Sequence, residues 1–157
     1  MTPRGDSEAA ARVRHMLEQI VDAVGVDADI DVTESGDGIQ ANLDGEDLGL
    51  LIGRHGQTID AIQHLAYRIA YRGEDDRKRV TVDAAGYRER RAALLQQDAD
   101  EAVEEALRTG EPVALDAMNA VERRVVHEYL RDRDGIETYS EGTEPDRYLV
   151  VAPVERS

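Results

Sequence analysis

The sequence contains no cysteine, no phenylalanine and no tryptophan. Without cysteine, disulfides, cysteine-ligated zinc and thiol catalysis are excluded. Without Phe and Trp, the core must be built from Leu, Ile, Val, Ala and Met, with the six tyrosines at its edges. No apolar run approaches the length of a membrane-spanning helix, and residues 1–6 do not resemble the start of a signal peptide. We therefore expect a cytoplasmic protein.

Positive charge is also scarce, and its distribution is uneven. The net charge is −15, and Lys78 is the single lysine among 19 basic residues. Residues 52–91 hold nine Lys or Arg against six acids, a net charge of +3, whereas residues 1–51 and 92–157 each carry −9. Because salt screens each charge beyond about 8 Å at physiological ionic strength, a local basic face works even on an acidic protein.

The composition of the 157 residues, 41% hydrophobic and 34% charged, is that of one average globular domain or two small ones. In the first half, helical spacing of apolar residues predicts helices over 8–24 (capped by Asp6 or Ser7), 47–52 and 57–72. Alternation with a period of two predicts strands over 28–34, 39–43 and 80–82. The order indicates an α+β sandwich with helices on one side of the strands.

The second half begins at a joint formed by residues 84–86, so we expect domains over 1–84 and 85–157. A long helix is predicted from Tyr87 to Thr109, followed by a short strand at 113–115, a helix capped by Asp116, and a hairpin of strands at 136–140 and 147–152. The inward stripe expected for the helix after Asp116 consists of Met118, Val121, Val125 and Tyr129.

A glycine-flanked loop, Gly53-Arg54-His55-Gly56, joins the two helices on either side of it. Glycine permits close approach of the backbone to a ligand, and a helix N-terminus offers unpaired N–H groups that suit phosphate. The loop is therefore interpreted as a clamp on a sugar–phosphate backbone, although an isolated GxxG also fits a plain tight turn. Beside such a clamp the bases need an apolar surface, and we expect Leu48, Leu51, Ile52 and Ile59 to supply part of it.

A second polar motif lies on the helix after Asp116. Arg123 and His127 are four residues apart and share a helix face, and Asn119 and Arg131 extend that face by one turn in each direction. This cationic ridge is suited to phosphates, with His127 able to stack on a base. The competing interpretation is an ordinary solvated face with an ion pair between Arg124 and Glu128.

Motifs of enzymes are missing. His127-Glu128 lacks the second histidine of a zinc hydrolase, and Ser140-Glu141-Gly142 is not a nucleophile elbow. The glycine loop lacks the Gly-Lys-Ser/Thr ending of a nucleotide P-loop. We predict a binding protein with no catalytic residue, no metal site and no cofactor.

Two stretches carry a specific resemblance. Residues 50–63, around the glycine loop, resemble the signature of the type II KH domain in the bacterial Jag/KhpB (SpoIIIJ-associated) family. Residues 119–127, with Arg123-x-x-x-His127, and residues 140–147 resemble the defining motif and the hairpin of the R-three-H domain of that family. The resemblance implies a type II KH sandwich (α-β-β-α-α-β) and a small three-stranded sheet with two helices.

The resemblance also implies that both domains bind single-stranded RNA, the second also single-stranded DNA. Carried over by position, the KH clamp consists of Gly53, Arg54, His55 and Gly56 with Gln57 and Thr58 at the helix start, and the second contact consists of Arg123 and His127. Further contacts are expected from Lys78, Arg79, Asn119, Arg124, Arg131 and Arg147.

Family members are associated with RNA chaperone activity, with control of cell elongation and envelope synthesis, and with a small KH-only partner. The rival interpretation is a protein-interaction module, a KH-mediated homodimer or adaptor with little affinity for RNA.

Overall fold

The computed structural model describes residues 7–155. Residues 1–6, where we considered Asp6 as a helix cap and a signal peptide as absent, lie outside that range. The chain divides into two compact units between Arg88 and Glu89, and each unit is described by itself. The expected boundary after residue 84 stays a prediction.

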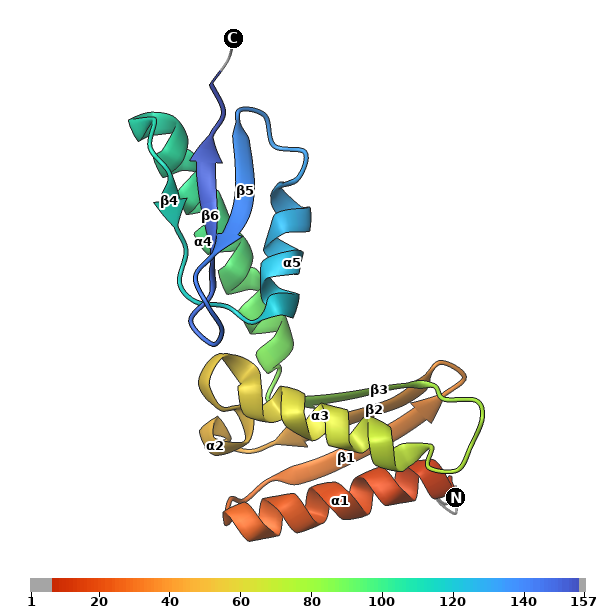
Figure 1. Cartoon of the computed structure of the whole chain (residues 1–157). Helices are drawn as coiled ribbons and strands as arrows, with labels where there is room; N and C mark the ends of the chain where they lie inside the picture. Colours follow the sequence, from red (N-terminus) through yellow and green to blue (C-terminus); the bar gives the residue numbers. More distant parts are fainter. Residues whose placement is uncertain (1–6, 156–157) are drawn as a thin grey trace. The chain divides into compact units, whose positions relative to one another are not determined.

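The first unit follows the order helix, two strands, two helical segments, a helix and a strand (Figure 1). Its elements are α1 (Glu8–Val24), β1 (Asp29–Ser35), β2 (Gly38–Asp44), α2 (Gly49–Ile52), the 3-10 turn η1 (Arg54–Gly56), α3 (Gln57–Ala70) and β3 (Arg79–Ala84). Ser7 caps α1, because its hydroxyl accepts a hydrogen bond from the N–H of Ala10 at 3.1 Å. These elements confirm the predicted order and the mixed α+β class.

The sheet of the first unit has the order β1-β2-β3. Strands β1 and β2 are antiparallel, whereas β3 runs parallel to β2, with Ile39 opposite Val80 and Ala41 opposite Val82. Because side chains alternate along a strand, these pairs share one face of the sheet. Helix α3 supplies the crossover between the two parallel strands, as parallel pairing requires.

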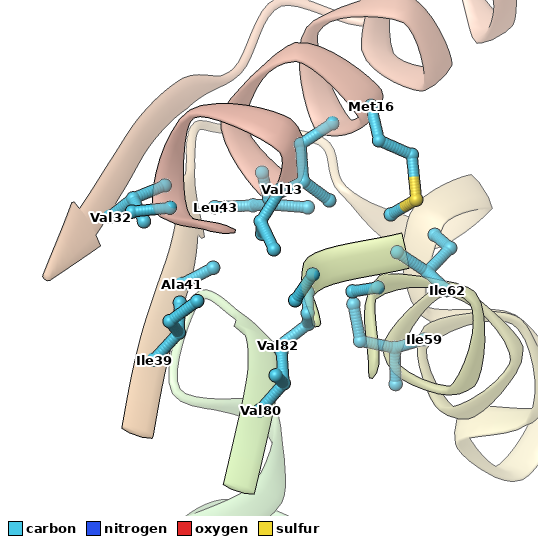
Figure 2. Packing of buried hydrophobic residues seen from close by; sticks show 14 of the residues in the cluster. Val13, Met16, Val32, Ile39, Ala41, Leu43, Ile59, Ile62, Val80 and Val82 are labelled. Carbon is cyan, nitrogen blue, oxygen red and sulfur yellow. The ribbon is translucent and has the colours of Figure 1, made fainter. Parts of the chain in front are cut away.

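The core of the first unit fills the space between that sheet face and helices α1 and α3 (Figure 2). Val13 on α1 and Ile59 on α3 are fully buried, and Figure 2 shows them beside Ala41 and Val82 of the sheet. Each buried Val, Leu or Ile side chain contributes about 1.5–3 kcal/mol relative to exposure. This packing fixes the start of α3, and hence the glycine loop that precedes it.

The second unit combines two helices with a three-stranded antiparallel sheet (Figure 1). Its elements are α4 (Tyr87–Thr109, whose first two residues belong to the first unit), β4 (Val113–Ala114), α5 (Ala120–Leu130), β5 (Ile136–Glu141) and β6 (Tyr148–Pro153). The sheet order is β4-β6-β5, so β6 is the central strand. Leu95 and Ala99 of α4, Val126 and Leu130 of α5, and Val151 of β6 share one core.

The expected N-terminal cap of α5 was wrong. The helix begins at Ala120 and is capped by Asn119 rather than Asp116. The side-chain oxygen of Asn119 accepts from the N–H of Glu122 at 2.9 Å, and the Glu122 carboxylate accepts from the N–H of Asn119 at 3.3 Å, which is a capping box. This reciprocal pair satisfies two backbone donors, whereas Asp116 lies four residues before the helix.

The predicted inward stripe is confirmed only in part, because Met118 is buried and Tyr129 packs against the core, whereas the two valines do not. Val121 is 72% exposed, and Val125 is exposed as well. Val126, Leu130 and the buried Arg123 face inward instead. The row of Val126 and Leu130 is the one that packs in the core, and Arg123 on the same face bonds Met118 and Glu144 inside the unit.

Candidate nucleic-acid interface

The glycine loop lies between α2 and α3, where three residues take positive φ angles. Gly53 has φ 74° and ψ 175°, His55 has φ 54° and ψ 27°, and Gly56 has φ 75° and ψ 14°. The N–H of Gly56 donates to the carbonyl of Gly53 at 3.2 Å, which closes the loop. Positive φ values are rare for residues other than glycine, so two of the three positions favour glycine and His55 adopts a strained conformation.

Each glycine is also required by the space around it. A Cβ at Gly53 would lie 2.2 Å from Thr58 Oγ1 and 2.9 Å from the Thr58 backbone nitrogen. A Cβ at Gly56 would lie 2.7 Å from the ring of Tyr87, the first residue of α4. The absence of a side chain at Gly53 thus leaves the N–H of Thr58 uncovered. At Gly56 it allows the ring of Tyr87 to pack directly against the loop backbone.

The start of α3 leaves polar groups for a ligand. Its N-cap is Gly56, which provides no side-chain hydrogen bond, so N–H groups of the first turn lack the usual capping partner. The side chains of Arg54, Gln57 and Thr58 are exposed and His55 is half-buried. Within residues 7–155, Arg54 has no ion-pair partner, so its guanidinium is available to an anion. Backbone donors and a free cation therefore meet at one loop.

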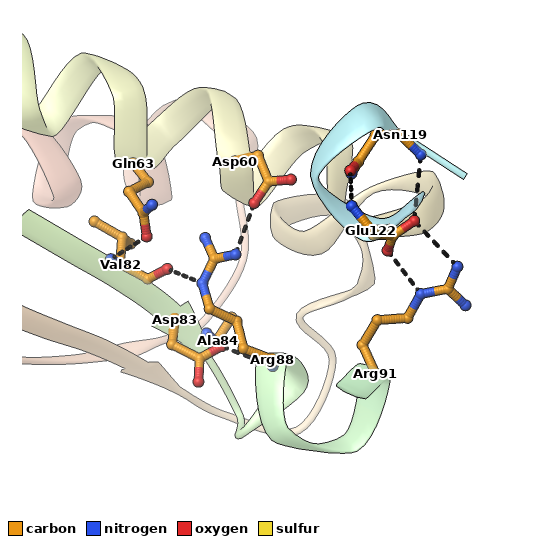
Figure 3. A network of polar contacts seen from close by, with 9 residues as sticks. All are labelled: Asp60, Gln63, Val82, Asp83, Ala84, Arg88, Arg91, Asn119 and Glu122. Carbon is orange, nitrogen blue, oxygen red and sulfur yellow. Dashed lines mark hydrogen bonds and ion pairs between the residues drawn. The ribbon is translucent and has the colours of Figure 1, made fainter. Parts of the chain in front are cut away.

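A polar network connects the first two turns of α3 to strand β3 and to Arg88 (Figure 3). Arg88 bonds the carboxylate of Asp60 at 2.7 Å and donates to the carbonyl of Val82 at 3.0 Å, while the Gln63 side chain accepts from the Val82 N–H at 3.0 Å. These contacts join α3, β3 and the first turn of α4. They give the loop a rigid support, which a ligand-binding geometry needs.

The other two basic residues expected in this unit lie at the start of β3, away from the loop in sequence. Lys78 is half-buried just before the strand, and Arg79 is exposed at its first position. Their role in binding stays a prediction.

The predicted apolar surface for the bases was wrong for three of its four residues. Leu48, Leu51 and Ile59 are buried in the core, with at most 4% of their surface exposed, and Ile52 is half-buried. Their apolar side chains are needed inside, where they pack between the helices and the sheet. Leu50, on the same short helix, is 69% exposed.

The second unit contains an open groove of about 410 Å³ between α5 and the hairpin of β5 and β6. Its walls combine cationic, hydroxyl and aromatic groups, from Ala120, Arg123, Arg124, His127, Thr138, Tyr139, Ser140, Arg147 and Leu149. Such a combination of charge and small polar groups suits a nucleotide better than an apolar ligand.

The accessible basic side chains of the groove come from both of its walls. Arg124 has 79% of its side chain exposed and forms an i,i+4 ion pair with Glu128 at 3.2 Å. His127 is exposed, and its Nδ1 is hydrogen-bonded to Thr138 Oγ1 on β5. Arg147 is half-buried just before β6 and donates from Nη1 to the carbonyl of Gly142 at 2.7 Å. The structure thus brings together three of the predicted residues.

The remaining predicted residues of this helix lie differently. Arg123 lines the groove but is 8% exposed, with its guanidinium bonded inside the unit. Asn119 uses its side chain in the capping box. Arg131 is exposed beyond the end of α5, outside the groove. The expected continuous ridge from Asn119 to Arg131 is therefore not a single exposed face.

Comparisons with protein families agree with both units. Residues 10–83 match the model "KhpA/KhpB, KH domain", and residues 93–153 match the R-three-H domain. "RNA-binding protein KhpB" of Clostridium symbiosum is 37% identical over 87% of this chain and 62% of its own length. The chain belongs to the Jag/KhpB family. The first unit is its KH domain and the second its R-three-H domain.

Other members of the family are similarly close to this chain. "RNA-binding protein KhpB" of Lactiplantibacillus plantarum is 38% identical over 96% of the chain and 50% of its own length. "RNA-binding protein KhpB" of Bacillus subtilis is 34% identical over 87% and 66%, respectively. The chain thus spans between half and two thirds of the length of these KhpB relatives.

Sequence reasoning missed several residues of the KH and R-three-H sites. Tyr87 was assigned to the second domain, and no pattern in the sequence around it indicates that its ring packs against Gly56. Thr138 and Ser140 occupy alternate positions of a predicted strand, so a search for hydroxyl groups on the face toward α5 would have found them.

No helix within residues 7–155 is both long and apolar enough to cross a membrane.

Proposed function

We propose that the chain binds single-stranded RNA, with the GxxG loop of the KH domain as a clamp on the sugar–phosphate backbone. The observation that carries this proposal is the exposed Arg54 in a loop of positive-φ residues, directly before the uncapped N-terminus of α3. Backbone N–H groups, a guanidinium and the helix dipole all favour phosphate at the same place. The relatives named as RNA-binding proteins support the choice of RNA.

The R-three-H groove provides the second proposed contact, for single-stranded RNA or DNA. Arg124, His127 and Arg147 present positive and stacking groups there, and the Thr138 hydroxyl orients the imidazole. Neither site contains an arrangement of catalytic groups known from the motifs above, so we propose binding without catalysis. The domains proposed for the two contacts are residues 1–84 and 85–157.

At the cellular level we propose a cytoplasmic RNA chaperone or post-transcriptional regulator linked to cell elongation and envelope synthesis. A small KH-only protein or a second copy of the chain is the proposed protein partner. These proposals rest on the family, whereas the RNA contacts rest on the geometry of the two sites.

The test replaces both side chains of the loop, in the variant Arg54→Asp with His55→Asp. Aspartate tolerates the left-handed conformation of His55, so the loop should keep its shape. We expect the affinity for a fluorescein-labelled oligouridylate, measured by anisotropy, to fall at least about tenfold, because like charges then face the phosphates.

A matched control carries the same change of charge elsewhere on α3, in the variant His64→Glu with Arg68→Glu. Both parent side chains are exposed. The control should bind nearly as the parent chain does. Equal losses in the two variants would mean that only overall charge matters, and unchanged binding of the loop variant would exclude the clamp.

The alternative function, a protein-interaction module, is favoured by one observation. Leu50, close to the glycine loop in sequence, is 69% exposed, and Leu65 on α3 is also exposed. Exposed apolar side chains of this size are common at protein contacts. Sedimentation velocity of the parent chain decides this alternative: a concentration-dependent dimer together with no measurable RNA affinity would replace the RNA-binding proposal.

A further inference from the structure

Arg123 gives the R-three-H motif its arginine, yet its guanidinium is already bonded within the domain. Only 10% of its side chain is exposed. Nη1 donates to the carbonyl of Met118 at 2.6 Å, and Nη2 forms an ion pair with the Glu144 carboxylate at 2.7 Å. The positive charge is therefore neutralised by Glu144 before any strand arrives.

The two partners of Arg123 belong to different segments of the groove. Met118 precedes α5, and Glu144 lies in the turn between β5 and β6. The same segments are joined a second time, because the N–H of Met118 donates to the carbonyl of Arg147 at 3.1 Å. Arg123 thus fastens the hairpin turn to the start of α5.

The turn that Arg123 fastens leads directly into Arg147, a half-buried cation of the groove. Arg147 follows Glu144 by three residues, and its own guanidinium closes the turn on the carbonyl of Gly142 at 2.7 Å. If the bond from Arg123 to Glu144 is lost, the turn keeps only its backbone bond from Met118 to Arg147. The side chain of Arg147 is then held less firmly at the groove. A phosphate that approached Arg123 directly would have to displace both the carboxylate and the Met118 carbonyl.

We propose that Arg123 is a positioning residue of the R-three-H groove, and that Arg124, His127 and Arg147 are the residues that touch the strand. This inference rests on the proposed function, since it assigns roles within the proposed RNA-binding groove.

The salt dependence of binding separates a phosphate contact from a positioning role. For single strands, each phosphate neutralised by the protein contributes about −0.7 to the slope of log K against log salt concentration. Removing a contact residue therefore makes the slope shallower by about 0.7, whereas removing a positioning residue lowers the affinity through misplacement of other groups. Loss of a positioning residue in the interior also lowers the melting temperature.

The experiment measures affinity for a labelled oligouridylate from about 50 to 200 mM salt, with the full chain and its variants. We expect Arg124→Gln to reduce the magnitude of the slope by about 0.7 with little change in melting temperature. Arg147→Gln should reduce the slope by about the same amount and lower the melting temperature slightly, because its bond to Gly142 is lost. Arg123→Met should lower both affinity and melting temperature while Arg124 keeps its contribution to the slope. Arg108→Gln, which removes an exposed arginine in the last turn of α4 outside the groove, is the matched control and should change neither.

Lysine substitutions decide the question even if Arg123→Met does not fold. Lysine keeps the charge but lacks the fork that reaches Met118 and Glu144 together. We expect Arg123→Lys to lose at least about tenfold in affinity, and Arg124→Lys to stay within about twofold of the parent chain. An Arg123→Lys variant that binds like Arg124→Lys, or an Arg123→Met variant that loses about 0.7 of slope at unchanged melting temperature, would overturn the inference.

Failure of the proposed function gives a different result. In that case the parent chain itself shows no salt-dependent binding of the oligouridylate, and the inference falls with it. Binding by the parent chain with a direct contribution from Arg123 rejects only the positioning role.

Discussion

Replacing Gly53 by alanine tests whether the shape of the GxxG loop determines RNA binding. The φ and ψ angles of Gly53, 74° and 175°, lie in a region that is essentially restricted to glycine, and another residue there costs about 1–3 kcal/mol. The added Cβ would also lie 2.2 Å from Thr58 Oγ1 and 2.8 Å from Thr58 Cβ. Overpacking of this kind costs about a further 1–3 kcal/mol.

Together the two effects predict a loss of about 2–6 kcal/mol in the free energy of unfolding of the KH domain. A domain of its size has a stability of about 4–12 kcal/mol, so most of this range leaves the domain folded but weakened. Gly73→Ala is the matched control. Gly73 also has a positive φ, 81°, but a Cβ there meets nothing within 4 Å, so only a backbone cost of about 1–2 kcal/mol is expected.

Urea unfolding followed through resolved amide NMR signals of the KH domain measures both variants, and fluorescence anisotropy measures their affinity for RNA. Gly53→Ala should lose more stability than Gly73→Ala and at least about tenfold in affinity, whereas Gly73→Ala should bind as the parent does. A Gly53→Ala chain as stable as Gly73→Ala would refute the steric argument. If Gly53→Ala lowers the stability but leaves the affinity for RNA unchanged, the shape of the loop does not determine RNA binding.

The remaining predictions concern stability. Burial of Tyr71, which is 3% exposed, and the nearby carboxylate of Glu34 raise the pKa of its phenol above the ordinary 10.0. The phenol therefore loses its proton at lower pH in the unfolded chain than in the folded one, so the stability that the neutral phenol contributes is present below about pH 10 and is lost as pH rises beyond it. Tyr71→Phe should flatten the decline in urea resistance between about pH 9 and 11. An equal decline in both chains would contradict the assignment. Asn119→Ala should cost the R-three-H domain about 1 kcal/mol by removing the cap of α5, measured as a lower melting temperature, and an unchanged value would show that water replaces the cap.

The sequence predicted the KH domain well because its strands and helices each bury one face. Val80 and Val82 alternate with polar residues, and the register places them opposite Ile39 and Ala41 of the parallel strand. Such periodic burial is a local property that the order of residues records directly. The position of the glycine loop followed from the same periodicity, since it is the gap between two helical stripes.

The helix α5 of the R-three-H domain was predicted less well because its inward face depends on a distant partner. Hydrophobicity favoured Val121 and Val125 as core residues, yet both are exposed and Arg123 is buried. Burial of an arginine is acceptable only when its charge is paired and its donors are bonded. The pairing group, Glu144, lies 21 residues further along the chain, so no local pattern indicates that it meets Arg123.

The two sites also suggest how so acidic a chain tolerates an anionic ligand. The KH loop offers backbone N–H groups and the guanidinium of Arg54, and backbone donors bind phosphate without adding net charge. In the R-three-H groove, Arg123 is buried and paired with Glu144, so we propose that the more accessible Arg124, His127 and Arg147 contact the strand. Contacts of this kind act within a few ångströms, well inside the screening length of about 8 Å, so distant acids contribute little repulsion at physiological salt. We therefore expect the surplus of acids to disfavour long, nonspecific contact with nucleic acid more than binding at the two proposed sites, so that the negative charge increases selectivity.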